Sequence, residues 1–262
     1  MRALFTAATG MMAQELNVQV ISNNIANMRT TGYKRQRAEF QDLLYEHVRR
    51  IGTQTSEQGN ILPVGVDLGS GVKTVGTPRL MTQGTLSQTG SDLDVAIRGE
   101  GFFKIQLPDG TYAYTRDGSF QMDAQGRIVT VQGNVVSPGI TVPQNSLGLT
   151  INSQGQVSVT PQGTTSPTVI GQITMTRFIN KAGLLAIGDN MFTETPASGT
   201  PQDGLPNIDG AGDLQQRNLE QANVEAVTEI SDLIAAQRAY EMNGKVITAA
   251  DQMLSATSNM MR

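Results

Sequence analysis

The sequence predicts an α+β fold, in which long helices at the two chain ends form a paired, coiled-coil-like layer around a central all-β domain and an extended arm. Apolar residues recur at every seventh position near the C-terminus, and a second stripe spaced by three, four or seven lies near the N-terminus. Between them the chain is rich in glycine and in short alternating segments. A sustained heptad pattern is typical of a helix that buries a narrow seam against another helix. We therefore expect the two termini to lie together.

The N-terminal stripe predicts one long helix, because its apolar positions share a single helical face. These positions are Leu4, Ala8, Met11, Val18, Ile21, Ile25 and Met28. Two β-branched residues followed by a glycine, Thr30 to Gly32, predict a break. Helix is expected to resume through Phe40, Leu43, Leu44 and Val48. The helical assembly part therefore covers residues 1–45, together with 213–262 at the other end.

Residues 46–79 are expected to form an extended arm or linker. From Ile51 to Arg79, glycines and prolines fall among isolated apolar residues, which predicts a largely loop-like segment. We expect this arm to lie across neighbouring subunits of an assembly.

Residues 80–198 are expected to form the β domain. Gly110, Gly118 and Gly126 recur every eight residues and Gly133 follows, which indicates a run of hairpins. Alternation with polar neighbours predicts that Tyr112 and Tyr114, and likewise Phe120 and Met122, point to a buried sheet face. Residues 199–212 are rich in proline and glycine and are expected to be a linker.

The C-terminal helix is expected to start by Leu219 and to reach the chain end. Its apolar row is Leu219, Ala226, Leu233, Tyr240, Ile247, Leu254 and Met261. Burial of these side chains is worth on the order of 10 kcal/mol, and a helix of this extent is roughly 65 Å long, so much of the seam needs other helices to cover it. The second core position of each heptad is expected at Asn223, Gln237, Gly244 and Asp251. Leu233→Asp is expected to disrupt the seam and Glu229→Ala to be nearly silent.

Composition argues against several classes of protein. The net charge of −4 disfavours a nucleic-acid surface, and the short basic cluster Lys34, Arg35 and Arg37 is expected to be a solvated helix flank. Without cysteine, no disulfide or thiolate site is possible. No segment approaches the roughly 20 apolar residues of a membrane span, and the amphipathic N-terminal segment does not read as a cleavable signal.

No catalytic, cofactor-binding or metal-ligating residues are predicted. His47 is the only histidine and is expected at the surface, without a nucleophile or metal partner. Asp109 and Asp117 precede glycines and are expected to form turns, and with Asp123 they lack the spacing of a calcium loop. Arg98 to Phe103 has too few glycines for a dinucleotide fingerprint.

Three segments resemble the bacterial flagellar axial proteins, the family of rod and hook subunits. Residues 21–35, ISNNIANMRTTGYKR, resemble the N-terminal signature of that family, and residues 223–254, including AAQRAYEMN, resemble its C-terminal signature. Residues 94–133 resemble the β domain that rod and hook proteins share. In its length and its arm, the chain resembles the distal rod members of this family in particular.

This resemblance implies a structural subunit, not an enzyme, that polymerises into the hollow tubular distal rod and transmits motor torque to the hook. It implies as partners further copies of the chain, proximal rod and hook subunits, the P-ring and L-ring bushing proteins, and the flagellar export apparatus. It also implies a place in the basal body, in the periplasmic space between peptidoglycan and outer membrane. The alternatives are a proximal rod or hook subunit of the same family, or a carbohydrate-binding β module, which the absence of Trp disfavours.

Overall fold

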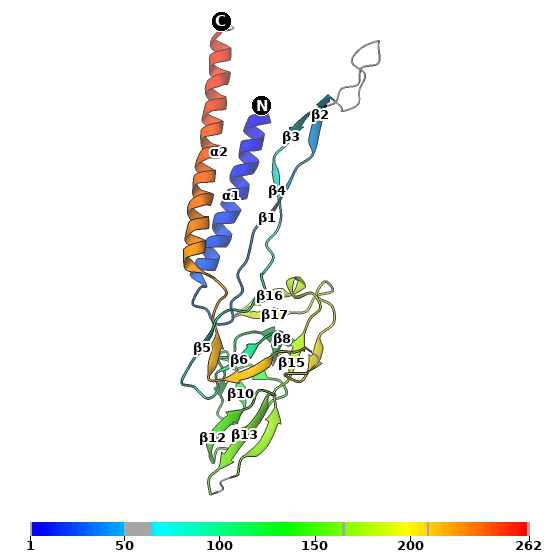
Figure 1. Cartoon of the computed structure of the whole chain (residues 1–262), viewed down its shortest axis with the longest axis vertical. Coiled ribbons are helices and arrows are strands. Elements are labelled where there is room, and N and C mark those ends of the chain that lie inside the picture. Colours follow the sequence, from blue (N-terminus) through cyan, green and yellow to red (C-terminus); the bar gives the residue numbers. More distant parts are fainter. Residues whose placement is uncertain (1, 50–63, 164–165, 209, 261–262) are drawn as a thin grey trace. The chain divides into compact units, whose positions relative to one another are not determined.

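The computed structural model describes residues 2–49, 64–163, 166–208 and 210–260. In these residues a long helix near each end of the chain flanks a β-rich middle, which confirms the α+β class (Figure 1). The chain divides into two compact units. One comprises Met1–Ile25, Gln36–Pro78 and Glu225–Arg262, and the other comprises Ala26–Arg35 and Arg79–Val224.

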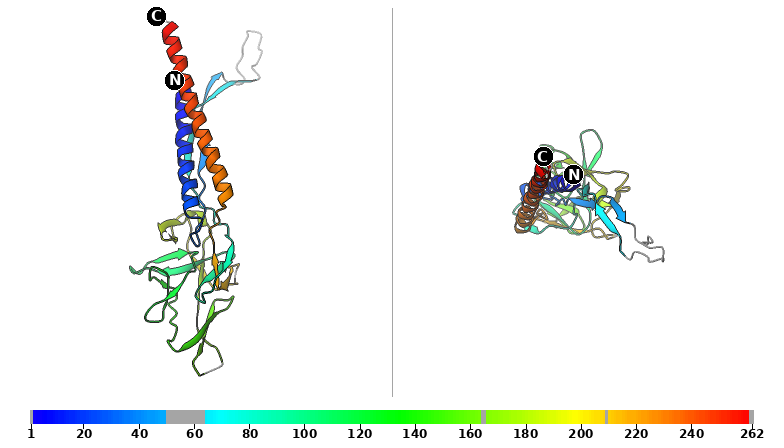
Figure 2. Two further views of the ribbon diagram at one scale, coloured as in Figure 1. Left: turned by 90° about the vertical axis from the view of Figure 1, so that its left-hand side faces the viewer. Right: turned by 90° about the horizontal axis from the view of Figure 1, so that it is seen from above.

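The first unit contains two helices and a two-stranded ribbon. Helix α1 (Arg2–Ala26) and helix α2 (Ala226–Met260) run side by side in opposite directions (Figures 1 and 2). In the ribbon, strand β1 (Glu39–Asp42) pairs with β4 (Val72–Gly76), and β2 (Tyr45–Arg49) pairs with β3 (Val66–Gly69). Both pairs are antiparallel, so the chain runs out along one strand of the ribbon and returns along the other.

The ribbon corrects two expectations. The helix expected to resume through Phe40 and Val48 is wrong, because Glu39–Asp42 and Tyr45–Arg49 are strands. The expected arm is extended, but Val66–Gly69 and Val72–Gly76 are paired strands instead of loop. Apolar residues in this segment are spaced as on a helix, yet pairing between strands satisfies the backbone of both segments at once. Residues 50–63 of the arm lie outside the described residues.

The second unit is built from short antiparallel strands. Within the described residues its main sheet has the order β16-β17-β8-β7-β11-β10-β9, with β15 beside β7 and β18 beside β15. A three-stranded sheet, β12-β13-β14, and the pairs β6–β19 and β5–β20 complete it. The bounds are β5 Leu86–Gln88, β6 Val95–Arg98, β7 Phe102–Gln106, β8 Tyr112–Thr115, β9 Gln121–Met122, β10 Ile128–Val129, β11 Val135–Val136, β12 Ser146–Ile151, β13 Gln156–Pro161, β14 Thr168–Gln172, β15 Met175–Arg177, the 3-10 turn η1 Lys181–Gly183, β16 Leu185–Gly188, β17 Met191–Thr193, β18 Gln202–Gly204, β19 Asp213–Gln216 and β20 Asn218–Glu220.

Three of the four periodic glycines are in hairpin turns. Gly110, Gly126 and Gly133 have φ values of 83°, 80° and 86°, which side chains other than glycine rarely adopt. Gly118 is not in such a turn, because strands β8 and β9 do not pair with each other. A Cβ on Gly118 would collide with the Val95 carbonyl oxygen, so this glycine permits a close approach between backbones.

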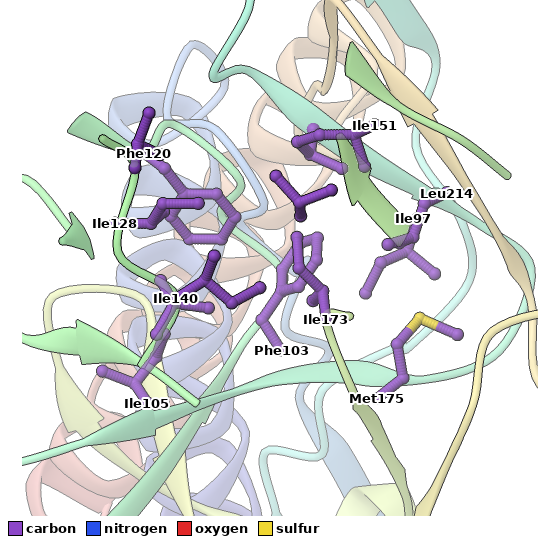
Figure 3. Close-up of a cluster of buried hydrophobic side chains, with 14 of the residues drawn as sticks. Ile97, Phe103, Ile105, Phe120, Ile128, Ile140, Ile151, Ile173, Met175 and Leu214 are labelled. Atoms are coloured by element: carbon purple, nitrogen blue, oxygen red, sulfur yellow. The ribbon is translucent and has the colours of Figure 1, made fainter. Parts of the chain in front are cut away.

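Two apolar cores lie on opposite faces of β7, because successive residues of a strand point to opposite sides. Phe103 belongs to the larger cluster, which is made up of Val95, Ile97, Phe103, Ile105, Phe120, Ile128, Val136, Ile140, Val142, Ile151, Val157, Val159, Ile173, Met175 and Leu214 (Figure 3). Phe102 packs with Tyr114, Phe178, Leu184 and Phe192 in the smaller one. Tyr114 and Phe120 are buried as expected, whereas the expectation is wrong for Tyr112 and Met122, which are exposed.

The segment before α2 also differs from expectation. Residues 199–212 include strand β18, which pairs with β15, so this segment is not only a linker. Leu219 lies in strand β20, paired with Ser87 of β5, and α2 begins seven residues later at Ala226. Met28 follows the end of α1 and lies in a turn.

Among the described residues, no helix has the length and hydropathy needed to cross a membrane.

Candidate assembly surface

A narrow seam joins the two helices of the first unit. Asn24 Nδ2 donates a hydrogen bond to Glu229 Oε2 at 3.2 Å, and both residues are buried. Gly10 lies against Asn243, since a Cβ on Gly10 would lie 2.8 Å from Asn243 Nδ2. The two contacts are separated by fourteen residues, two heptads, on each helix. The seam therefore keeps one register over this distance.

The second core position of the α2 heptads is one residue earlier than expected. Glu229, Ala236 and Ala250 are buried, and Asn243 is half-buried. Gln237 and Asp251, which were expected in these places, are exposed. Asn223 lies before α2 and belongs to the other unit. The expectation that Glu229→Ala is silent is also wrong in its premise, because Glu229 is not a surface residue.

The predicted seam residues divide into three groups. Ile21 is buried, and partial burial is shared by Leu4, Ala8, Met11, Val18, Ile25, Ala226, Leu233 and Ile247. Tyr240 and Leu254 are 46% and 44% exposed. Leu219 and Met28 are not on a helix, and Met261 lies outside the described residues. The intact row on α2 therefore runs from Ala226 to Leu254.

Both helices also present large apolar side chains to solvent. On α1, Phe5 and Met12 lie one heptad apart, and Met12 is 70% exposed. Helix α2 extends past the N-terminal end of α1 (Figure 2). Along α2, exposed apolar side chains are spaced by three, four, seven or eight residues. They are Val227, Ile230, Ile234, Met242, Val246, Met253 and Met260. Residues 251–260 are all exposed. Rows of large, exposed apolar side chains such as these are expected at an interaction site.

The ribbon packs on α1 through a glycine. Gly71 has a φ of 115°, and a Cβ there would collide with Thr9 Oγ1. The backbone N–H of Val72 lies 3.4 Å from the same oxygen. Arg2 and Glu46 form an ion pair farther along the ribbon. The ribbon also exposes apolar side chains, among them Leu44.

A buried charge cluster lies in the second unit and was not expected. Lys34 Nζ donates to Glu220 Oε1 at 2.6 Å and to the Thr82 carbonyl at 2.8 Å, and Arg116 Nη1 lies 3.2 Å from Glu220 Oε2. All three charged side chains are almost fully buried. Burial lowers the pKa of Lys34, and the Glu220 carboxylate opposes that shift. Lys34 is therefore not on a solvated helix flank.

This cluster holds together segments from both ends of the chain. The Gly32 N–H donates to the Glu220 carbonyl at 2.8 Å, and the Arg35 N–H donates to Asn223 Oδ1 at 2.7 Å. Asn223 Nδ2 in turn donates to the Leu80 carbonyl at 2.8 Å. In the sequence, Glu220 is a carboxylate next to the first residue of the apolar repeat, Leu219. Its spacing from Lys34 gives no indication that the two side chains form an ion pair.

The side chains considered as candidates for catalysis or metal binding make local hydrogen bonds instead. His47 is exposed on β2, and its Nδ1 lies 2.6 Å from Asp67 Oδ1. Asp109 and Asp117 each accept a backbone hydrogen bond from the residue two positions later, as turn formers do. Within the described part of the chain, no three His, Cys, Asp or Glu residues are grouped as metal ligands.

Comparisons with known proteins point to one family over nearly the whole chain. A family model for the flagellar basal-body rod proteins matches residues 4–34, one for the D1 domain of the flagellar hook protein FlgE/F/G matches residues 96–159, and one for the C-terminal part of basal-body rod FlgEFG proteins matches residues 215–260. The flagellar basal-body rod protein FlgG of Caulobacter vibrioides is 55% identical over 260 residues, 99% of each chain. Proteins of the same name from Agrobacterium fabrum and Bacillus subtilis are 49% and 34% identical over the full length of both chains. The chain therefore belongs to the family of flagellar basal-body rod proteins FlgG.

Proposed function

We propose that this chain is the structural subunit that polymerises into the hollow, tubular distal rod of the flagellar basal body and transmits motor torque to the hook. The exposed apolar faces of α1 and α2 carry this proposal. In the isolated chain, Phe5, Met12, Met242, Met253 and Met260 face solvent, at a cost that other copies of the chain can remove.

Polymerisation follows from the fact that these faces differ. The exposed apolar residues of α1 and those of α2 are not copies of one patch, so a contact between them is heterologous. Heterologous contacts build an open helical polymer when the rotation between subunits does not close into a ring. The membership of a rod-protein family supports this form of assembly over a closed oligomer.

The assembly seam we propose consists of the partly covered rows next to the contact between α1 and α2. It includes Leu4, Ala8, Met11, Val18, Ile21 and Ile25 on α1, and Ala226, Leu233, Tyr240, Ile247 and Leu254 on α2. Partial burial of most of these side chains supports a shared role, in which one helix covers part of each residue and a neighbouring subunit covers the rest.

We propose four kinds of partner besides further copies of the chain. They are proximal rod subunits below, hook subunits above, the P-ring and L-ring proteins around the shaft, and the flagellar export apparatus. The proposed place is the periplasmic space between peptidoglycan and outer membrane. An outer wall formed by the β domain would be suited to ring contacts, since its strands pack around their own cores.

Electron microscopy of the purified chain at high concentration tests the proposal. Straight tubes of uniform width are expected. Curved tubes would support the hook alternative, and a solution that holds only single chains at every concentration would contradict polymerisation. A variant with Met12→Ser and Met253→Ser should shift tube formation to higher concentration, whereas Met122→Ser, an exposed change in the β domain, should not.

A further inference from the structure

Two adjacent residues of α1 contact two different elements. Gly10 contacts Asn243 of α2, and Thr9 contacts Gly71 of the ribbon. Each contact has a glycine on one side and a polar side chain on the other. In both cases, the polar side chain occupies the space that a Cβ on the glycine would need.

The space at Gly10 exists at only one height of the seam. A shift of α2 along α1 by one heptad would bring Asn243 opposite Ala3 or Asn17, the residues seven positions from Gly10. Both carry the Cβ that Gly10 lacks. The Asn243 side chain therefore fits against α1 in one register and meets an obstacle in the two neighbouring ones.

A polar contact two heptads away selects the same register. Asn24 Nδ2 donates to Glu229 Oε2 and also to the Gln36 carbonyl at 2.8 Å, while the Gln36 N–H donates to Asn24 Oδ1 at 2.9 Å. A one-heptad shift would separate the buried Asn24 from Glu229. Polar residues at core positions of paired helices are known to specify register in this way.

We propose that Gly10 and Asn243, supported by Asn24 and Glu229, determine the axial register of α2 on α1, and that Thr9 and Gly71 fix the ribbon on α1 at the same level. Helices α1 and α2 then cannot slide past one another by a heptad, and the ribbon stays level with them. Axial shifts of one packed helix along another are a known mode of motion. For a shaft, this would oppose bending within each subunit, and only that consequence rests on the proposed function.

Intramolecular disulfide formation tests the register, because the chain contains no cysteine. Asn17→Cys with Ala236→Cys places one thiol on each helix, midway between the two contacts. Ala13→Cys with Ile247→Cys is one heptad out of register. Under mild oxidation in dilute solution, the first pair should cross-link at least tenfold faster than the second.

The register residues are then changed in the background of each cysteine pair. Gly10→Ala should slow the in-register cross-link and speed the other. Adding Asn243→Ala should restore the original preference, because it removes the side chain that the new methyl group displaces. Gly244→Ala is the matched control on the same helix, since a Cβ there has no atom within 4 Å, and it should leave both rates unchanged.

The ribbon contact has its own matched pair. Gly71→Ala should release the ribbon from α1, seen as faster proteolysis after Lys73. Gly76→Ala, where a Cβ has open space, should not. Equal cross-linking rates in Gly10→Ala and the parent chain, or no recovery in the double variant, would overturn the register proposal. A chain that cross-links in register but forms no tubes would contradict the proposed function and leave the register proposal supported.

Discussion

Glu220→Gln would leave two buried cations without a counter-charge. In the structure the Glu220 carboxylate lies 2.6 Å from Lys34 Nζ and 3.2 Å from Arg116 Nη1, and it accepts the Gly84 N–H at 2.9 Å. Loss of one partner from a buried ion pair costs about 3–5 kcal/mol, because the remaining charge stays buried without compensation. For a unit of this size, that corresponds to a fall in Tm of roughly 6–20 °C.

Thermal unfolding followed by the β-sheet circular dichroism signal measures this effect. The matched control is Asp92→Asn, which breaks the ion pair between Asp92 and Arg217 at the surface, where both side chains are exposed. Such a pair contributes about 0–1 kcal/mol. Lys34→Met added to Glu220→Gln should recover part of the loss, because it removes one uncompensated cation.

Equal losses of Tm in Glu220→Gln and Asp92→Asn would contradict this role of Glu220. So would a full additional loss of Tm from Lys34→Met in the Glu220→Gln variant, since the two side chains would then not interact. Either result would mean that the cluster does not hold the two chain segments together through charge.

Three further predictions concern other parts of the molecule. Burial, and then Glu194 and Asp203, raise the pKa of Tyr114 to about 12. Since an unfolded tyrosine ionises near 10, the free energy of unfolding should fall as the pH rises from about 10 to about 12. Chemical unfolding measured across this pH range should show this slope in the parent chain and lose it in Tyr114→Phe. Phe103→Ala should cost about 3–5 kcal/mol in urea unfolding, because Phe103 is fully buried in the larger core; a cost below 1 kcal/mol would contradict that packing. Leu233→Asp should abolish tube formation and motility, whereas Glu241→Ala, at an exposed position of α2, should preserve both.

The sequence predicted the parts of the fold that local pattern determines. A seven-residue apolar repeat is a property of the helix itself, so α2 could be read from Ala226 onward. Turn glycines such as Gly110 likewise signal their own backbone conformation. The helix pairing and the β body follow from these local signals.

Pairing with distant segments decided the parts that were predicted wrongly. Leu219 fits the heptad row, but its segment pairs with Leu86–Gln88 and so becomes a strand. Phe40 and Val48 are spaced as on a helix, but their segments pair with the returning half of the ribbon. Strand pairing depends on a partner that the local sequence does not contain.

The side chains of the candidate surface show the same division. The apolar row on α2 was predicted, but its polar companions were placed one residue too late, because Gln237 and Asp251 are as polar as Glu229 and Asn243. Which of two adjacent polar positions faces the seam depends on contacts such as that between Asn24 and Glu229. The charge cluster around Glu220 joins residues far apart in the chain, so no local pattern indicates it.

Amide hydrogen exchange, compared between the single chain and the assembled tube, tests most directly whether the terminal helices are the assembly surface. In the single chain, we expect the paired helices α1 and α2 to be only partly protected, and residues 251–260 to exchange fastest; in the tube, both helices should be strongly protected. Strands of the β domain, such as β7, should be equally protected in both states. Equal protection of α1 and α2 in the two states would contradict assembly through these helices.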